Sequence, residues 1–410
     1  MTRLTLLTIF AFAISTASAA DWSRFRGENG TGTTADAVPL KWNKETTKWT
    51  SDLPGIGNGS PIVVKGKIYL QSAAKDGSKR HLVCFDSTTG KQEWITTLPG
   101  QKAHTHAKNS LASSTPACDG ERIYCVFWDG NNVELYGFNL AGQELWKQKL
   151  GGYISQHGVG ASPMVVNGKV IVNYDQDGAA EIVAFDGKTG TKAWSASRKA
   201  FRACYATPFL RGKDLVVSST AGLTGYDPNT GAVNWNWEWK FDGMALRTVG
   251  SPVEAGNLVV AISGDGGGSR HTVVIDPESD GSKPELKWEK KKDAPYVPGP
   301  IALKDHLFWV TDTGLAMCHE LKTGKEVWNE RERVFSNPVS ASLILTQSTS
   351  NDPLILAISE TGHAIFFKAS PKGFDIVAEN DLKESVFATP AVAEGKLFVR
   401  TGSKLVCFGK

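Results

Sequence analysis

The sequence predicts an all-β fold, an eight-bladed β-propeller of four-stranded antiparallel blades, and three observations carry this prediction. The chain repeats a unit of roughly 40–55 residues eight times. Each unit holds four apolar runs of strand length, separated by turn residues. The 410 residues include 42 Gly and 13 Trp but only 4 Met, a composition typical of short strands and tight turns.

Each unit has a recognisable start and end. A Ser/Thr-Pro-like pair opens the unit, and a Trp closes it in the first six units. The opening prolines are Pro61, Pro116, Pro163, Pro208, Pro252, Pro300, Pro338 and Pro390. The closing tryptophans are Trp94, Trp146, Trp194, Trp235, Trp288 and Trp328. The seventh unit, from Pro338, lacks its Trp and is the most degraded.

The turns inside the units indicate antiparallel hairpins. Asn167-Gly168 and Asp119-Gly120 suit tight turns because Asn, Asp and Gly tolerate positive φ. In the turn from Asp86 to Gly90, the Asp can bond the turn backbone and the Gly can adopt the left-handed conformation. Four antiparallel strands in each short unit are typical of a propeller blade.

The two ends of the chain predict how the ring closes. The last unit, from Pro390, stops after three strands, whereas Lys48-Trp49-Thr50 stands before the first unit. We therefore expect this N-terminal segment to supply the outer strand of the eighth blade, since closure leaves no open edge. We expect the repeated Trp to be structural, with each ring covering the neighbouring blade and burying about 150–250 Å².

The first twenty residues are predicted to be a signal peptide. Arg3 supplies a positive start, Leu4 to Ile14 form a short apolar run, and Ala17-Ser18-Ala19 fits a cleavage site. An uncleaved anchor is the alternative. The predicted organisation is a signal peptide over 1–20, an N-terminal extension over 21–47 and the propeller over 48–410. We expect an exported protein, periplasmic or extracellular, with no transmembrane span.

The charge balance argues against one class of partner. The formal net charge is +3, and no run of Lys and Arg is longer than Lys290-Lys291-Lys292. A nucleic-acid-binding protein would carry a stronger basic stretch or face. We expect no nucleic acid among the partners, and a monomer.

The unit Phe-Asp-x-x-Thr-Gly-Lys-x-x-Trp, preceded by Ser-Pro-x-Val-x-x-Gly-Lys-x-Tyr, resembles the PQQ-type (quinoprotein-like) propeller repeat over nearly all of the chain after residue 20. That superfamily includes quinoprotein dehydrogenases, the BamB-like assembly factors and many exported PQQ-like repeat proteins. The opening from Asp21 to Gly32 looks like that of the exported group. The dehydrogenases resemble this chain in their blades but use an adjacent cysteine pair and a Glu, Asn and Asp calcium set. This sequence has no adjacent cysteines, and the calcium set has no residue-by-residue match in it. The cysteine of a BamB lipoprotein is absent as well.

The six cysteines can be interpreted as disulfide partners, because the chain is expected to be exported, or as free buried thiols. Cys84, Cys318 and Cys407 occupy one third-strand position, where other units place Gly137, Ala184, Gly225 and Val274. We expect these three to be small buried thiols. Cys118 and Cys125 flank one hairpin but are offset, which makes them poor disulfide partners.

Polar residues gather on the loops that precede the inner strands, which should ring the mouth of the central channel on one face. The candidate ligand-binding residues are His104, His106, His157, Arg202, Tyr205, Arg247, Asp265, Arg270 and His271. Three interpretations compete: loop residues lining a wet channel, a ligand pocket in which Arg forks hold a carboxylate or sugar hydroxyls, and a metal site from His104, His106 and His157. No catalytic residues are identified.

The sequence thus predicts a binding or protein-interaction module, with a polar ligand site at the channel mouth. Its partner is expected to be an unknown protein or a small polar or anionic ligand, and no cofactor or metal is predicted. A PQQ-dependent dehydrogenase is the alternative function.

Overall fold

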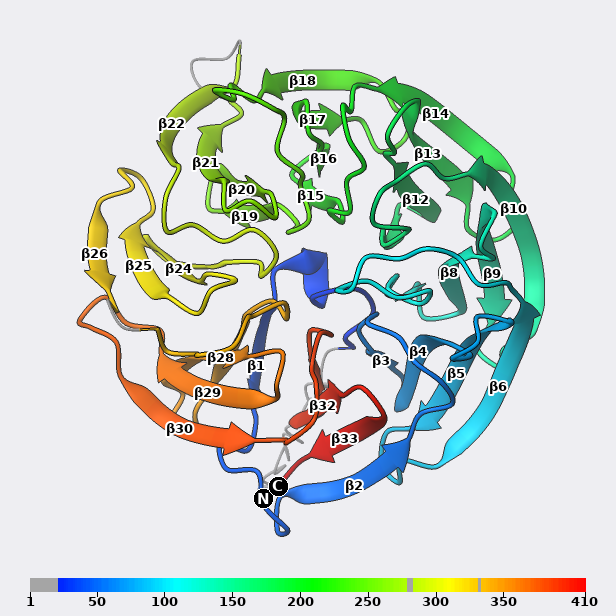
Figure 1. The fold of residues 1–410 in the computed structure, drawn as a ribbon, viewed down its shortest axis with the longest axis horizontal. Helices are drawn as coiled ribbons and strands as arrows, with labels where there is room; N and C mark the ends of the chain where they lie inside the picture. The colour runs from blue at the N-terminus through cyan, green and yellow to red at the C-terminus, as the bar shows by residue number, and fades with distance from the viewer. Residues whose placement is uncertain (1–20, 279–282, 331–332) are drawn as a thin grey trace, which may run out of the picture.

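The protein is a ring of eight β-sheets around a central axis (Figure 1). The computed structural model describes residues 21–278, 283–330 and 333–410. Seven sheets have four strands and one has five, and the helical structure in these ranges is the 3-10 turn η1 (Glu28–Gly30). The predicted all-β, eight-bladed propeller is confirmed. The predicted signal peptide lies outside the described residues, and within them no helix has the length and apolar character needed to cross a membrane.

The first four blades follow one another along the chain, each from its inner to its outer strand. Their strands are β3 (Ile62–Val64), β4 (Lys67–Ala73), β5 (Lys79–Asp86) and β6 (Gln92–Pro99); β7 (Ala117–Cys118), β8 (Arg122–Trp128), β9 (Asn132–Asn139) and β10 (Glu144–Gly152); β11 (Met164–Val166), β12 (Lys169–Tyr174), β13 (Ala180–Asp186) and β14 (Lys192–Arg198); and β15 (Phe209–Arg211), β16 (Asp214–Ser218), β17 (Gly222–Tyr226) and β18 (Val233–Glu238).

The last four blades continue in the same way, with two strands added from the N-terminal segment, β1 (Thr33–Ala37) and β2 (Thr47–Asp52). Their own strands are β19 (Val253–Ala255), β20 (Leu258–Gly264), β21 (Arg270–Asp276) and β22 (Glu285–Lys290); β23 (Ile301–Leu303), β24 (His306–Val310), β25 (Ala316–Glu320) and β26 (Glu326–Asn329); β27 (Ile344–Gln347), β28 (Pro353–Ile358), β29 (His363–Lys368) and β30 (Ile376–Asp381); and β31 (Ala391–Ala393), β32 (Lys396–Arg400) and β33 (Lys404–Phe408).

The N-terminal segment closes the ring as expected. Strand β2 pairs antiparallel with β33, which places Trp49 opposite Cys407. The eighth blade is therefore built from segments near both ends of the described chain, and Figure 1 shows β2 beside β33 and the C-terminus. This closure leaves no open seam between the first and last blades.

The seventh blade corrects one sequence expectation. Its inner strand β27 begins at Ile344, so Ser342 and Leu343, not Asn337 and Pro338, stand where the other units have Ser/Thr-Pro. Strand β1 pairs with β27 in parallel and makes this the five-stranded sheet. Pro338 lies in the preceding loop, where its carbonyl accepts a hydrogen bond from the Glu360 N–H at 2.7 Å.

The repeated Trp stands directly opposite the small residue of the third strand. A Cβ at Gly137 would lie 2.4 Å from the Trp146 ring, so this position must be small. The opposed pairs are Cys84–Trp94, Gly137–Trp146, Ala184–Trp194, Gly225–Trp235, Val274–Trp288, Cys318–Trp328, Phe366–Ala378 and Cys407–Trp49. In the seventh blade large and small have exchanged strands, which explains its missing Trp.

Each of these Trp rings also reaches the next blade. The Trp146 indole N–H donates to the Gly187 carbonyl at 3.0 Å, and a Cβ on Gly190 of the same turn would lie 2.6 Å from the ring. Gly190 has φ 72°, so glycine is required there for backbone and packing alike. The indoles of Trp49, Trp194, Trp288 and Trp328 donate to the next blade in the same way. Trp235 differs, because it donates to Asp214 of its own blade.

All six cysteines are free, buried thiols. Cys84, Cys318 and Cys407 therefore act as the small buried side chains that the repeat predicts. Burial raises the pKa of each of these thiols to about 12, which keeps them protonated.

Candidate functional site

The N-terminal segment lies across the axis and closes one end of the channel. Trp22 pairs with Val63 of the first blade, and the Asn29 amide exchanges two hydrogen bonds of 2.7 and 2.8 Å with the Leu210 backbone of the fourth. The η1 turn stands at the centre of the ring in Figure 1. The segment thus ties several inner strands together, and its Phe25 lines the cavity above it.

A buried arginine of this segment fills a gap in the sixth blade. The Arg26 guanidinium donates to the Pro300 carbonyl at 2.7 Å and is fully buried. A Cβ at Gly299 would lie 2.4 Å from this guanidinium, so glycine is needed beside it. Burial lowers the pKa of Arg26 to about 9.

Seven blades contribute one hydroxyl each to a belt around the axis. The belt residues are Ser60, Thr115, Ser162, Thr207, Ser251, Ser342 and Thr389, and all of them line the axial cavity. Six of them immediately precede an opening proline, and Gly299 holds the place in the sixth blade.

Neighbouring belt residues bond to one another around the ring. The Ser60 N–H donates to the Thr115 hydroxyl at 2.9 Å, and the Thr115 N–H donates to the Ser162 hydroxyl at 2.9 Å. The same bond joins Thr207 to Ser251, Gly299 to Ser342 and Ser342 to Thr389. These hydroxyl oxygens accept from the backbone, so their own O–H groups are left to donate elsewhere.

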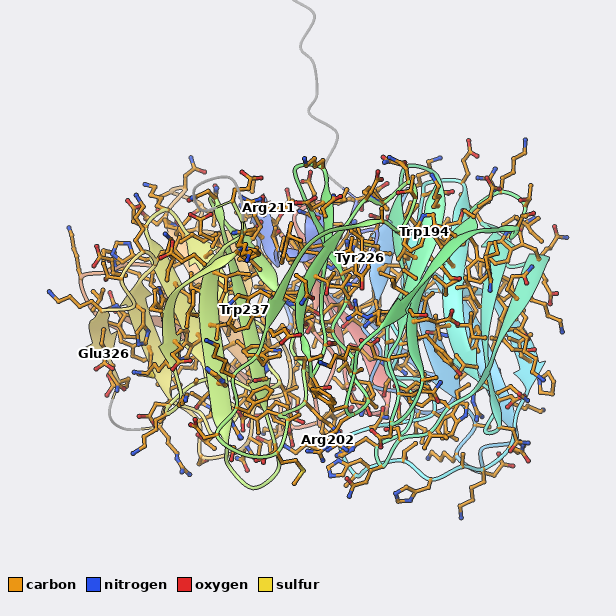
Figure 2. All side chains as sticks on the ribbon, turned by 90° about the horizontal axis from the view of Figure 1, so that it is seen from above. Trp194, Arg202, Arg211, Tyr226, Trp237 and Glu326 are labelled. Atoms are coloured by element: carbon orange, nitrogen blue, oxygen red, sulfur yellow. The ribbon has the colours of Figure 1, made fainter. Side chains whose placement is uncertain are left out.

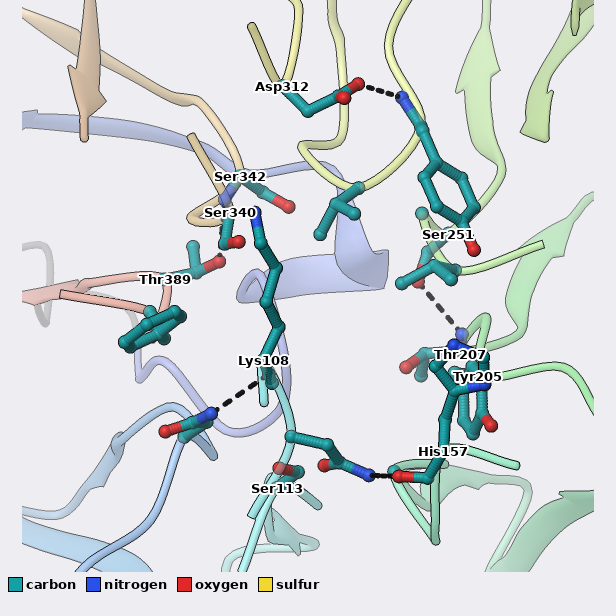
Figure 3. Close-up of a pocket in the computed structure, with 18 of the residues that line it drawn as sticks. Lys108, Ser113, His157, Tyr205, Thr207, Ser251, Asp312, Ser340, Ser342 and Thr389 are labelled. Carbon is teal, nitrogen blue, oxygen red and sulfur yellow. Dashed lines mark hydrogen bonds between the residues drawn. The ribbon is translucent and has the colours of Figure 1, made fainter. Parts of the chain in front are cut away.

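The belt encloses a chamber of about 500 Å³ on the propeller axis. That volume falls within the range of small-molecule sites. The wall at its mouth, opposite the N-terminal segment, comes from loops that precede the inner strands, including His106, His157 and Tyr205, and from the β20–β21 connection at Asp265. Figure 3 shows Ser251, Thr207, Ser342 and Thr389 around this space.

Two ion pairs partly cover the chamber. Lys108, in the loop before the second blade, bonds Glu360 of the seventh blade at 2.7 Å, and Figure 3 shows its side chain reaching across the cavity. Glu360 also accepts from the Ser340 hydroxyl at 2.6 Å. Arg270 pairs with Asp312 through two hydrogen bonds. The cations at the chamber are thus neutralised by carboxylates of the protein.

The aromatic groups at the mouth are held in place by ring contacts and hydrogen bonds. The His106 and His157 rings lie 4.7 Å apart, and the Tyr205 hydroxyl hydrogen-bonds that of Ser155 at 2.7 Å. Burial, followed by the nearby charges of Arg247, His106 and Arg202, lowers the pKa of His157 to about 4. His157 is therefore a neutral imidazole at neutral pH, and its buried Nδ1 has no hydrogen-bond partner.

A second cavity lies beside the chamber on the same face. It is lined by Arg202, Arg247, Gln156 and Asp177, with Phe201 and Met244 among its apolar walls. Arg247 donates to the Gln156 carbonyl oxygen at 3.3 Å, and Arg202 donates to the Ala245 carbonyl at 3.4 Å.

The nine predicted site residues thus fall into three groups. His106, His157, Tyr205, Asp265 and Arg270 line the chamber. Arg202 and Arg247 line the second cavity. His104 and His271 line neither cavity. His104 is exposed, whereas His271 is buried between Trp239 and Phe241 and bonds Glu289 at 2.8 Å.

The sequence reading missed the belt, Lys108 as a bridge, and Asp312. The belt had a visible signal, because Ser or Thr precedes the opening proline in six units. The Lys108–Glu360 contact had none, since 252 residues separate the partners.

The chamber does not fit PQQ, a flat quinone with three carboxylates. Lys108 and Arg270 are already paired with Glu360 and Asp312. Among the described residues, no group of three His, Cys, Asp or Glu side chains is arranged to hold a metal ion. A tricarboxylate would thus meet a hydroxyl belt and cations that already have partners.

Comparisons with known proteins agree with this architecture. The family described as outer membrane protein assembly factor BamB (PQQ_2) matches residues 31–152 and 111–330. BamB of Shewanella oneidensis is 26% identical over 149 residues, which is 34% of this chain and 36% of that protein, so the aligned region spans about a third of the relative.

Solved propellers share the fold at low identity. BamB from Moraxella catarrhalis superposes with a TM-score of 0.64 and 14% identity, covering 89% of this chain and 97% of that one. The quinohemoprotein alcohol dehydrogenase from Comamonas testosteroni superposes with a TM-score of 0.66 and 14% identity, covering 95% and 81%. Because the family match spans most of the propeller, the chain belongs to the PQQ_2 family of BamB-like β-propeller proteins.

Proposed function

We propose that this chain is an exported binding module that holds a small polyhydroxylated ligand in the axial chamber. The observation that carries the proposal is the belt, in which seven blades direct hydroxyl groups at one enclosed volume of about 500 Å³. The N-terminal segment closes the other end, so a ligand would enter and leave by one mouth. The proposal includes the domain organisation expected from the sequence: a signal peptide over 1–20, an N-terminal extension over 21–47 and the propeller over 48–410.

The chemistry of the chamber favours a neutral, hydroxyl-rich ligand such as a sugar. The belt hydroxyls can donate to a ligand. Asn58 and Asn109 line the same wall, and their amide NH2 groups are held by the Lys108, His157 and Val159 carbonyls. The two cations are already paired, so a free anion gains little there. Tyr205, Tyr296, Phe25 and Phe387 also line the chamber and give it apolar surface for the apolar side of a sugar.

A role in protein interaction is the second candidate, and one surface observation favours it. Ile154, Phe201 and Met244 are 65%, 57% and 73% exposed in the loops around the mouth. Exposed apolar side chains gathered on one face are typical of interaction sites. The relationship to an assembly factor supports the same role. The dehydrogenase alternative rests on a fold likeness alone, and fold does not fix function.

The proposal is tested by filling the chamber. Val249 lines it without contributing to the belt, so Val249→Phe should occupy ligand volume and leave the hydroxyl bonds intact. Calorimetric titration of the full chain with gluco-, galacto- and manno-configured disaccharides should detect binding that this variant reduces at least tenfold.

Val233→Phe is the matched control, because Val233 is 57% exposed on the outer strand of the fourth blade. It should bind as the wild type does. If no disaccharide binds the wild type, or if both variants bind equally well, the chamber is not the site.

A further inference from the structure

We propose that the cavity between Arg202 and Arg247 binds the carboxylate of an acidic sugar whose hydroxyls occupy the axial chamber. This inference rests on the proposed function and assigns the ligand class more narrowly. It concerns a second cavity, and the argument for it begins with the charges there.

Arg247 is a buried cation without a carboxylate partner. It is only 4% exposed, and its Nε has no hydrogen-bond partner. Within the described part of the chain, its guanidinium donates one hydrogen bond, to the neutral amide of Gln156 at 3.3 Å. A buried guanidinium that lacks a counter-charge is costly, and a bidentate oxyanion satisfies its fork geometry.

Arg202 lines the same cavity and also lacks a carboxylate partner. Among the residues that the structure describes, its guanidinium donates only to the Ala245 carbonyl, at 3.4 Å. Across the described ranges, no ion pair joins Arg202 or Arg247 to a carboxylate, whereas Arg198 and Arg270 each have an Asp partner. Arg26 and Arg400 are also buried without a carboxylate, but they donate to backbone carbonyls at 2.7–2.8 Å, whereas Arg202 and Arg247 line an open cavity. Asp177 lines the cavity but accepts from the Ala203 N–H at 2.7 Å. Two cations therefore face one carboxylate, which leaves room for a further negative charge.

The cavity and the chamber are neighbours, so one ligand can reach both. Gln156 lines the cavity and His157 lines the chamber, and Arg202 and Tyr205 divide in the same way. The charges of Arg247 and Arg202 also act on His157, where they help to lower its pKa. Asp265 faces the chamber, which disfavours an anion there and favours one in the arginine cavity.

The apolar wall of the cavity suits a sugar ring. Phe201 is 57% exposed beside Arg202, and the Lys199 ammonium lies over one face of its ring, 5.4 Å from the centroid. A sugar acid would place its ring against the other face of Phe201 and its carboxylate between the two arginines. An inorganic anion would use only the second of these features.

The test compares two disaccharides that differ only in their carboxylates, digalacturonate and galactobiose, by calorimetric titration of the full chain. Digalacturonate should bind at least tenfold more tightly at low ionic strength, and added salt should reduce that advantage. Arg202→Gln should remove the advantage without changing the affinity for galactobiose. Arg202 is the residue to change because it is less buried than Arg247, and an unchanged melting temperature will show that the variant folds.

Arg122→Gln is the control, since Arg122 lies in the β7–β8 hairpin on the opposite face. Figure 2 shows Arg202 on one face of the ring and Arg211 on the other. Arg211 lies in the β15–β16 hairpin of the fourth blade, which corresponds to the β7–β8 hairpin of Arg122. Equal affinities for the two sugars, or an equal loss in Arg122→Gln, would overturn the carboxylate site and leave the chamber proposal standing. Failure of both sugars to bind would overturn both.

Discussion

Trp49 joins the eighth blade to the first, so Trp49→Ala tests whether ring closure stabilises the propeller. The indole N–H donates to the Ser87 carbonyl at 3.1 Å, and a Cβ on Gly90 would lie 2.4 Å from the ring. The ring therefore rests on the turn of the first blade. Ser51 of the same strand adds a second contact, since its hydroxyl donates to the Gly90 carbonyl at 2.5 Å.

The expected cost follows from these contacts. A partly buried Trp that loses about 120 Å² of contact forfeits about 3 kcal/mol at ~25 cal/mol per Å². The lost hydrogen bond adds about 1 kcal/mol. Trp49→Ala should therefore reduce the free energy of unfolding by about 4 kcal/mol, within the usual range for Trp→Ala.

The measurement is urea unfolding followed by far-UV circular dichroism. Trp49→Phe keeps a ring on Gly90 but cannot donate to Ser87, so it should lose less than half as much. A change below about 0.5 kcal/mol in Trp49→Ala, the level of a neutral surface substitution, would refute the role of this contact in closure.

Two further predictions concern buried groups. Cys84→Ala should cost about 1 kcal/mol, since few buried atoms are lost, and the six thiols should react with a thiol reagent only after unfolding; a disulfide found by mass spectrometry would contradict this. His319 is fully buried, stacks on Trp309 at 4.1 Å, and has no hydrogen-bond partner on either nitrogen. Burial lowers its pKa to about 3, so the unfolded state takes up the proton first and stability is lost as pH falls below about 6.5. Relative to His319→Phe, the wild type should lose about 3 kcal/mol between pH 6.5 and 4, and parallel pH profiles would refute the assignment.

Much of the fold could be predicted because the repeat records local packing. The Trp and its small partner recur in register, which sets strand number, blade number and closure. The sequence predicts the wrong start for the seventh blade because Phe366 and Ala378 exchange the large and small positions and no Trp marks the end. Pro338 then offered a false start, which only the pairing of β27 corrects.

The site was less predictable because it depends on which loops meet across the axis. The histidines are candidate ligand-binding residues on residue type alone, yet His271 packs against Trp239 and Phe241. Phe25 was not assigned to the chamber, since nothing in the local sequence shows that the N-terminal segment enters the channel. The ion pair of Lys108 with Glu360 likewise depends on ring geometry.

The central claim is that the axial chamber holds a hydroxylated ligand, and a crystal structure of the full chain soaked with the disaccharide that binds most tightly tests it most directly. We predict sugar density on the axis, with hydroxyls in contact with the belt at Ser162, Thr207 and Ser251. Density confined to the outer surface of the blades, or a chamber filled by a quinone, would contradict the claim.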